Sequence, residues 1–424
     1  MLQRQGVAMS HENDPPPAAG AQVWLSVVGI GEDGLEGLSP AARRAVEAAE
    51  TLFGGRRHLA LVGERPEQER ITWPSPLEEA RPWLLQRRGR SVCVLASGDP
   101  VWYGIGATLT RWLPAEEMRV YPAPSAFTLA AARMGWPLQD TRCLTLHGRA
   151  LERILPWLQP GARLLALSWD ETTPAALGRL LTDRGFGDAR MTVLARMGGD
   201  HEQQEAATAS RWADEPETVA DLNTVAIECP PERTTAPIAA TPGRPEDDFD
   251  HDGVITKREV RAVVLAHLAP GRGERLWDIG AGSGAVGIEW MLADTANRTI
   301  AVEPRPERAA RIQTNARHFG VPELECITAS APGVLAELAA PDAVFIGGGL
   351  STPGLLEACH SALPPGGRLV ASGVTLEAES MLYAARGQYG GELIRLEVSR
   401  AEPLGGFTGW SPLRAVTLWV CTRT

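Results

Sequence analysis

The run Asp278-Ile279-Gly280-Ala281-Gly282-Ser283-Gly284 constrains the fold of this chain more than any other segment. It follows an apolar stretch typical of a strand and precedes residues 285–292, whose apolar pattern is typical of a helix. Glycines at alternate positions weaken a strand–helix junction unless a ligand must approach bare backbone. Glu303 ends the next apolar run, where its carboxylate can hold two ribose hydroxyls. The sequence therefore predicts an α/β unit that binds a nucleoside-containing cofactor.

Two cofactors compete for this unit. The stretch from Gly282 to Gly287 also fits the dinucleotide fingerprint G-x-G-x-x-G, with an acid about 20 residues further on. Asp278 distinguishes the two, because a carboxylate at the strand end suits a cationic ligand such as S-adenosylmethionine. The same carboxylate would repel a pyrophosphate at the helix N-terminus. The sequence favours the methyl donor, with a dinucleotide or a plain glycine turn as alternatives.

Length and charge limit the class of protein. At 424 residues the chain is expected to form two or three domains, and its net charge of −11 argues against a general nucleic-acid or membrane-surface binder. The six cysteines form no C-x-x-C pair, which predicts reduced thiols, a cytoplasmic location and no zinc or other metal site. No apolar run approaches the ~20 residues of a membrane helix.

The first half alternates apolar runs with helix-like stretches. Residues 1–20 are rich in proline and predict a disordered tail, and residues 21–230 have an α/β pattern. The proline- and acid-rich residues 231–245 predict a linker. Ser39-Pro40 and Thr173-Pro174 are typical helix starts. The predicted strands of this half are residues 23–28, 91–96, 143–146, 163–167, 191–195 and 225–229.

A second α/β domain is predicted over residues 246–424. Its last two strands are separated only by a glycine-rich loop, which predicts an antiparallel hairpin at the sheet edge. Seven strands with such a hairpin favour the class I methyltransferase sheet over the six-stranded dinucleotide sheet. The predicted strands are residues 275–279, 299–302, 324–327, 343–346, 368–371, 393–398 and 416–421, and the predicted helices are residues 257–267, 285–292, 307–318, 333–339, 354–363 and 377–388.

The residues of the second domain predict a cradle for the methyl donor. Asp278, Gly280, Gly282 and Gly284 would surround it, Glu303 would hold its ribose, and residues 329–331 would flank its adenine. The bare run Gly347-Gly348-Gly349 after the fourth strand suits a large flat substrate packed close to the backbone. An ordinary strand-to-helix turn is the alternative for these glycines.

Several segments of this domain together resemble a known family. Asp247-Asp248-Phe249, the sequence Thr256-Lys257-x-Glu259-Val260-Arg261, the glycine loop 278–284 and Gly347-Gly348-Gly349 resemble the cobalamin-pathway methyltransferases and decarboxylases of precorrins. The resemblance covers residues 246–424 and implies a class I Rossmann-like fold of seven strands. It also implies methylation at C15 with loss of the ring C acetate carboxylate. The residues it implies for donor binding are Thr256, Asp278, Gly280, Ala281, Gly282, Ser283, Gly284, Glu303 and Ala331.

The first half resembles a different family, the tetrapyrrole methylases, in its C5-methylating precorrin branch. That fold, class III among methyltransferases, is a pair of α/β subdomains with S-adenosylmethionine in the cleft between them. The resemblance implies that Gly98, Asp99 and Ser125 hold the donor. It rests on residues 28–34, 54–59, 96–100, 103–106, 124–125, 146–149 and 184–187.

Both resemblances imply one pathway, cobalamin biosynthesis, with a metal-free, carboxylate-rich tetrapyrrole as substrate. Another tetrapyrrole, small molecule or protein as the methyl acceptor remains an alternative. A nicotinamide-dependent oxidoreductase or a non-catalytic nucleotide-sensing module is a further one. No catalytic acid or base is assigned from the sequence. Relatives of the second domain imply a homo-oligomer, with a tetramer as one form. Arginines that are either surface residues or partners of substrate carboxylates are Arg258, Arg261, Arg395, Arg400 and Arg414.

Overall fold

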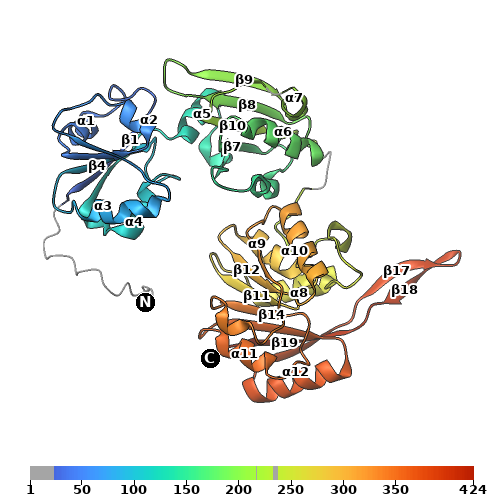
Figure 1. The fold of residues 1–424 in the computed structure, drawn as a ribbon. Helices are drawn as coiled ribbons and strands as arrows, with labels where there is room; N and C mark the ends of the chain where they lie inside the picture. Colours follow the sequence, from blue (N-terminus) through green and yellow to red (C-terminus); the bar gives the residue numbers. More distant parts are fainter. Residues whose placement is uncertain (1–22, 216, 233–236) are drawn as a thin grey trace. The chain divides into compact units, whose positions relative to one another are not determined.

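The computed structural model describes residues 23–215, 217–232 and 237–424 (Figure 1). The tail predicted for residues 1–20 and part of the predicted linker lie outside these residues. Contacts divide the chain into two compact units. The first unit comprises Met1–His147, Arg163–Ala175 and Arg190–Ile227, and the second comprises Gly148–Ala162, Ala176–Ala189 and Glu228–Thr424.

The first unit holds two five-stranded sheets. One is fully parallel, in the order β3-β2-β4-β1-β5, so the carboxyl ends of its strands share one edge. Its strands are β1 (Leu25–Ile30), β2 (Thr51–Gly54), β3 (Glu69–Thr72), β4 (Val92–Ser97) and β5 (Met118–Tyr121). Its helices are α1 (Pro40–Glu47), α2 (Arg56–Ala60), α3 (Ala80–Leu85) and α4 (Gly106–Trp112). Ser39 caps α1 as predicted, because its side chain accepts a hydrogen bond from the Ala42 amide.

The second sheet of this unit has the order β6-β7-β10-β8-β9. β6 and β7 pair in parallel, and β8 and β9 pair antiparallel. The strands are β6 (Arg142–Thr145), β7 (Arg163–Leu167), β8 (Arg190–Ala195), β9 (Gln203–Thr208) and β10 (Asn223–Glu228), and the helices of this part of the chain are α5 (Ala126–Met134), α6 (Thr173–Asp183) and α7 (Ala209–Asp214). Most of α6 falls within the residues 176–189 that are assigned to the second unit. The α/β prediction is confirmed, but β2, β3, β5 and β9 were not predicted.

The second unit contains a seven-stranded sheet in the order β13-β12-β11-β14-β15-β19-β16. The first five strands in that order are parallel, and β19 pairs antiparallel with both β15 and β16. This is the predicted sheet with its terminal hairpin. The strands are β11 (Arg275–Ile279), β12 (Arg298–Val302), β13 (Glu325–Ile327), β14 (Ala343–Ile346), β15 (Arg368–Gly373), β16 (Glu392–Leu396) and β19 (Val416–Thr422).

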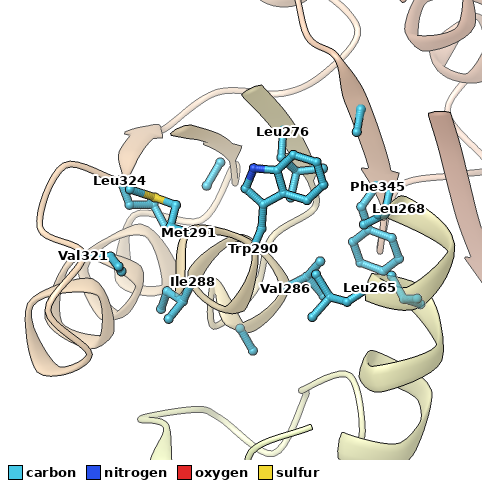
Figure 2. Packing of buried hydrophobic residues seen from close by; sticks show 14 of the residues in the cluster. Leu265, Leu268, Leu276, Val286, Ile288, Trp290, Met291, Val321, Leu324 and Phe345 are labelled. Atoms are coloured by element: carbon cyan, nitrogen blue, oxygen red, sulfur yellow. The ribbon is translucent and has the colours of Figure 1, made fainter. Parts of the chain in front are cut away.

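Helices cover both faces of this sheet. Successive side chains of β11 point to opposite faces and are buried on both, so each face needs a covering layer. Leu276 joins the core under α8 (Arg258–Leu268), α9 (Ala285–Ala293) and α10 (Pro306–His318). Figure 2 shows Leu276 beside Trp290 of α9 in this core. Trp277 joins the opposite core, under α11 (Leu355–Ala362) and α12 (Leu376–Tyr389). Asp278 therefore lies on the α9 side of the sheet.

Two local predictions in the second unit were wrong. Residues 333–339 form no α-helix, only a short 3-10 turn over Leu335–Glu337. The glycine-rich loop before the last strand contains a two-stranded ribbon of β17 (Ser399–Leu404) and β18 (Phe407–Pro412). Figure 1 shows this ribbon extending away from the seven-stranded sheet. Its strands pack on no core and lack the alternating apolar pattern by which a core strand is predicted, so the sequence pattern did not reveal them.

Candidate functional site

The glycine loop lies between β11 and α9, at the carboxyl edge of the seven-stranded sheet. Gly280, Gly282 and Gly284 all have left-handed backbone, with φ of 68°, 60° and 76°. A side chain costs roughly 1–2 kcal/mol in that conformation. A Cβ on Gly280 would lie 2.7 Å from the Gly348 Cα, whereas a Cβ on Gly282 would meet nothing nearer than the Val254 carbonyl oxygen at 3.8 Å. The backbone at Gly282 therefore borders open space that a ligand can occupy.

Asp278 lies behind this loop and is 1% exposed. Its Oδ2 accepts a hydrogen bond from the Gly287 amide at 3.0 Å, and its Oδ1 is buried with no hydrogen-bond partner in the structure. Burial, opposed by the Gly287 hydrogen bond and assisted by the negative charge of Glu303, raises the pKa of Asp278 to about 7. An unpaired buried carboxylate oxygen is costly, and a cationic ligand group at the loop would offset that cost.

Glu303 follows β12 and is 2% exposed. Its Oε2 accepts from the Gly282 amide at 2.9 Å, and its Oε1 accepts from the Arg305 amide at 3.1 Å. The carboxylate is thereby fixed against the glycine loop. Each carboxylate oxygen keeps a further lone pair, so both can accept from a pair of vicinal hydroxyls.

The remaining predicted donor-binding residues of this half lie around the same edge. The backbone of Val254, two residues before Thr256, lies opposite Gly282, and Thr256 precedes α8. Ala281 packs on the core of the α9 face, and the Ser283 carbonyl accepts from Asn315 at 2.9 Å. Ala331 follows β13, which neighbours β12, and packs against the core of the opposite face.

The loop after β14 contacts the end of β11 and the glycine loop through backbone atoms. β14 is the parallel neighbour of β11, and the amide of Gly347 donates to the Ile279 carbonyl at 2.9 Å. Gly348 supplies the atoms that would clash with a Cβ on Gly280. The close approach of the two backbone segments therefore requires glycine at position 280, whereas a Cβ on Gly348 would meet the Gly280 backbone at no less than 3.6 Å.

Arg261 was expected either on the surface or at substrate carboxylates, and both expectations are wrong. Its side chain is 0% exposed, and its Nε donates to Glu289 Oε1 at 2.8 Å. Glu289 also accepts from the Gly243 and Arg244 amides, so this pair fixes the segment before the second domain to α9. Arg400 pairs with Glu246 and Glu259, and Arg395 pairs with Glu379. Arg258 and Arg414 are exposed.

The predicted donor residues of the first half gather at the carboxyl end of β4. Gly98 follows this strand with φ of 53°, and a Cβ there would lie 2.9 Å from the Pro124 carbonyl oxygen and from the Ser125 Cα. Asp99 Oδ1 accepts from the Val101 amide at 2.9 Å, which forms a tight turn. Ser125 caps α5 by accepting from the Thr128 amide at 3.1 Å. The structure therefore brings Gly98 and Ser125 together.

Sequence reasoning missed a polar cluster beside these residues. Arg57 forms an ion pair with Glu32, and its Nη2 contacts both Ser97 Oγ at 2.8 Å and His58 Nε2 at 3.0 Å. His58 Nε2 lies 2.8 Å from Ser97 Oγ. The resemblance included the segments 28–34, 54–59 and 96–100, but it did not bring these four side chains together. The available signal was the placement of these polar residues directly after strands.

The described parts of the chain contain neither a candidate metal-ligand group nor a helix suited to crossing a membrane. Residues 23–215, 217–232 and 237–424 contain no group of three or more His, Cys, Asp or Glu residues that could hold a metal ion. In the same residues, no helix combines the length and the apolar character that crossing a bilayer requires.

Two family models match this sequence. The model of Tetrapyrrole (Corrin/Porphyrin) Methylases matches residues 25–213, and the model of the Precorrin methyltransferase domain matches residues 247–423.

Several relatives that match 94% of this chain carry the same name. A Sinorhizobium sp protein called precorrin-6Y C(5,15)-methyltransferase (decarboxylating) is 48% identical over 94% of this chain and 96% of its own length. A Mycobacterium tuberculosis (strain CDC 1551 / Oshkosh) protein of the same name is 42% identical over 94% of this chain and 100% of its own. The crystal structure of the C-terminal domain of precorrin-6Y C5,15-methyltransferase from Rhodobacter capsulatus has 47% identity, covers 44% of this chain and 100% of that chain, and gives a TM-score of 0.42.

Proposed function

This chain belongs to the family of decarboxylating precorrin-6Y C(5,15)-methyltransferases, and we propose that it methylates a precorrin at C5 and C15 and removes its ring C acetate carboxylate. The methyl donor is S-adenosylmethionine, and the pathway is cobalamin biosynthesis. We assign C5 methylation to residues 21–230 and C15 methylation with decarboxylation to residues 246–424, joined by a linker at 231–245. The two matched families, one for each half, support this division.

One observation carries the donor assignment in the second half. The backbone at Gly282 borders open space, and its amide donates to the buried carboxylate of Glu303. Asp278, at the start of the same loop, is buried and one of its oxygens has no partner. This set suits a ligand that carries positive charge and vicinal hydroxyls. It disfavours a pyrophosphate, which would lie beside negative charge.

S-adenosylmethionine supplies an electrophilic methyl group on a sulfonium. The protein must then orient the acceptor carbon and keep water out, and orientation alone can lower the barrier by roughly 7–11 kcal/mol. In the second half, Asp278 and Glu303 hold the donor from the strand ends, Thr256 lies beside it, and Ala331 flanks the adenine. In the first half, Gly98, Asp99 and Ser125 hold the donor.

The substrate carries many carboxylates, and exposed arginines at the second domain can pair with them. Arg258 and Arg414 are exposed and are the candidates for this role. For decarboxylation, the electron pair of the breaking C–C bond enters the protonated tetrapyrrole system. The protein aligns that bond with the ring π-system and limits solvation of the acetate.

We further propose that the chain forms a homo-oligomer, with a tetramer through the second domain as one form. Leu404, Phe407 and Trp410 on the β17–β18 ribbon are 69%, 84% and 78% exposed. Large apolar side chains gathered on an exposed ribbon mark an interaction surface. The free cysteines Cys93, Cys143, Cys229, Cys326, Cys359 and Cys421 support a reducing, cytoplasmic location.

Mass spectrometry of the tetrapyrrole product tests the function. The full-length protein with a reduced precorrin-6 substrate and S-adenosylmethionine should add two methyl groups and release one carbon dioxide. Gly98→Ala should abolish C5 methylation but retain C15 methylation and carbon dioxide release. Gly282→Asp should abolish carbon dioxide release. An unchanged substrate mass with wild-type protein that is folded and binds the donor would overturn the substrate assignment.

A further inference from the structure

Three adjacent strands of the first sheet end in one polar cluster. The order β2-β4-β1 brings α2 after β2, Ser97 at the end of β4 and Glu32 after β1 to the same carboxyl edge. The Gly98 amide donates to the Ile30 carbonyl at 3.1 Å, which joins the ends of β4 and β1. Ligands of parallel α/β sheets bind outside this edge. Within this cluster, Ser97 directly precedes Gly98 and Asp99, the proposed donor residues of this half.

The hydrogen-bond directions within the cluster follow from the chemistry of arginine. A guanidinium only donates, so the contact from Arg57 Nη2 at 3.0 Å requires His58 Nε2 to be an acceptor. The imidazole proton is therefore on Nδ1. The Ser97 hydroxyl, which lies 2.8 Å from the same Nε2, must then donate to it. Ser97 Oγ also accepts from Arg57 Nη2 at 2.8 Å, and one lone pair remains.

This cluster differs from a structural hydrogen-bond network in its exposure. Ser97 is exposed, whereas His58 is half-buried and its Nδ1 is buried without a partner. Burial, together with the adjacent Arg57 charge, lowers the pKa of His58 to about 4, so the imidazole is neutral near pH 7. The charged groups that face it are Arg57 and, through Arg57, Glu32.

Methylation of an unsubstituted bridge carbon requires a proton acceptor. The enamine electron pair forms the new C–C bond as the S–CH3 bond breaks, and the positive charge moves from sulfur to the substrate as an iminium. The bridge carbon then carries both a methyl group and its original hydrogen. Conjugation returns when that hydrogen leaves as a proton and its electron pair neutralises the iminium. Because the C–H bond of such a cation is acidic, a weak neutral base suffices.

We propose that Ser97 Oγ receives the proton from C5 while passing its own hydroxyl proton to His58 Nε2. Ser97 is then a catalytic residue, and Arg57 and His58 are positioning residues that fix its hydroxyl. His58 becomes imidazolium beside Arg57, which favours rapid loss of the proton to water. This inference rests on the proposed C5 methylation by the first half.

The test uses full-length protein and a metal-free precorrin substrate that carries deuterium at C5. Ser97→Ala should lower kcat for C5 methylation by at least about 100-fold with little change in KM. It should also produce a primary deuterium isotope effect that the wild type lacks, because proton removal becomes rate-limiting. Ser97→Thr should restore most of the rate. Adding His58→Gln to Ser97→Ala should cause little further loss, since the two residues act as one unit.

Thr110→Ala is the matched control, because it removes an exposed hydroxyl of the same sheet's α4 and should leave kcat unchanged. C15 methylation and carbon dioxide release should persist in every variant. Wild-type rates and no isotope effect in Ser97→Ala would overturn the inference and leave the proposed function intact. A wild-type protein that adds no methyl group at C5 would instead overturn the proposed function.

Discussion

The amide of Gly287 donates a 3.0 Å hydrogen bond to Asp278 Oδ2, so the carboxyl group at the end of β11 is joined to the first turn of α9. The second oxygen of this group is equally buried and has no partner. A helix amide thus stabilises half of a carboxylate, and the other half depends on protonation or on a ligand. The ionisation of Asp278 should therefore affect both stability and donor binding.

Asp278→Asn should change how stability depends on pH. The folded-state pKa of about 7 lies above the ordinary value of 3.8, so the folded state binds this proton more tightly. The corresponding stability is present below pH ~4 and is lost as pH rises through ~7, by at most about 4 kcal/mol. The Asn variant cannot ionise, so it should be the more stable protein at pH 8. Urea unfolding, monitored through the hydrogen exchange of α9 peptides, measures the free energy of unfolding of each variant at each pH.

The exposed variant Glu337→Gln is the control for that experiment, and its pH profile should match the wild type. If Asp278→Asn lost as much stability as the wild type between pH 5 and pH 8, Asp278 would not be the responsible group.

Alanine at Gly280 and alanine at Gly282, both in the glycine loop, should differ in their effects on stability and on donor binding. Gly280→Ala should destabilise the protein by roughly 2–5 kcal/mol, because left-handed strain adds to a clash with Gly348. Gly282→Ala has open space, so it should cost only the strain, about 1–2 kcal/mol, yet weaken S-adenosylmethionine binding. Thermal unfolding and titration calorimetry measure the two effects.

Gly366→Ala supplies the matched comparison for strain alone. Gly366 has φ of 82°, and a Cβ there would meet nothing within 4 Å. This variant should lose the same stability as Gly282→Ala and keep full donor affinity at the second domain. Equal donor affinity in the two variants would show that Gly282 does not border the ligand.

Glu289→Gln should be strongly destabilising. It leaves the fully buried Arg261 guanidinium without its counter-charge and weakens the bonds to the Gly243 and Arg244 amides. Breaking such a pair typically costs about 3–5 kcal/mol. Arg395→Ala, which breaks an ion pair with 52% of the arginine side chain exposed, should cost less than about 1 kcal/mol. Equal losses in urea unfolding would contradict the assignment of Arg261 and Glu289 as a buried pair.

Phe407→Ser combined with Trp410→Ser should lower the oligomeric mass seen by light scattering. Both side chains are exposed on the ribbon, so a folded single chain loses little from their removal. The matched control is Leu376→Ser, which removes an 81% exposed apolar side chain at the start of α12. An unchanged mass in the ribbon variant would exclude the ribbon from the interface.

The sequence predicted the strands that combine apolar content with clear boundaries. β7, β11 and β14 match their predicted residues fully, because each is an apolar run that ends in a turn or glycine signal. β9 has the sequence Gln-Gln-Glu-Ala-Ala-Thr at the edge of its sheet, where one partner strand suffices and apolar side chains are not required. The sequence pattern of such an edge strand cannot be distinguished from that of a polar loop.

The two candidate sites also differ in how far the sequence could predict them. The glycine loop and Glu303 are local to one strand–turn–helix–strand unit, so the sequence spacing was enough to associate them. The cluster of Glu32, Arg57, His58 and Ser97 depends on the strand order β2-β4-β1, which the sequence does not state. For Arg261, the sequence interpretation was wrong about burial. A charge on a helix was expected in solvent, whereas its buried partner Glu289 lies 28 residues away.

The contact between Gly280 and Gly348 has a mechanical consequence. Because no side chain separates the two loops, neither can shift without displacing the other. The loop after β11 is the proposed donor site, and the loop after β14 lies at the adjacent strand end, where the acceptor ring is expected. Reacting partners placed on these two loops would share one rigid frame, so their alignment would be set by main-chain geometry that most side-chain substitutions leave intact.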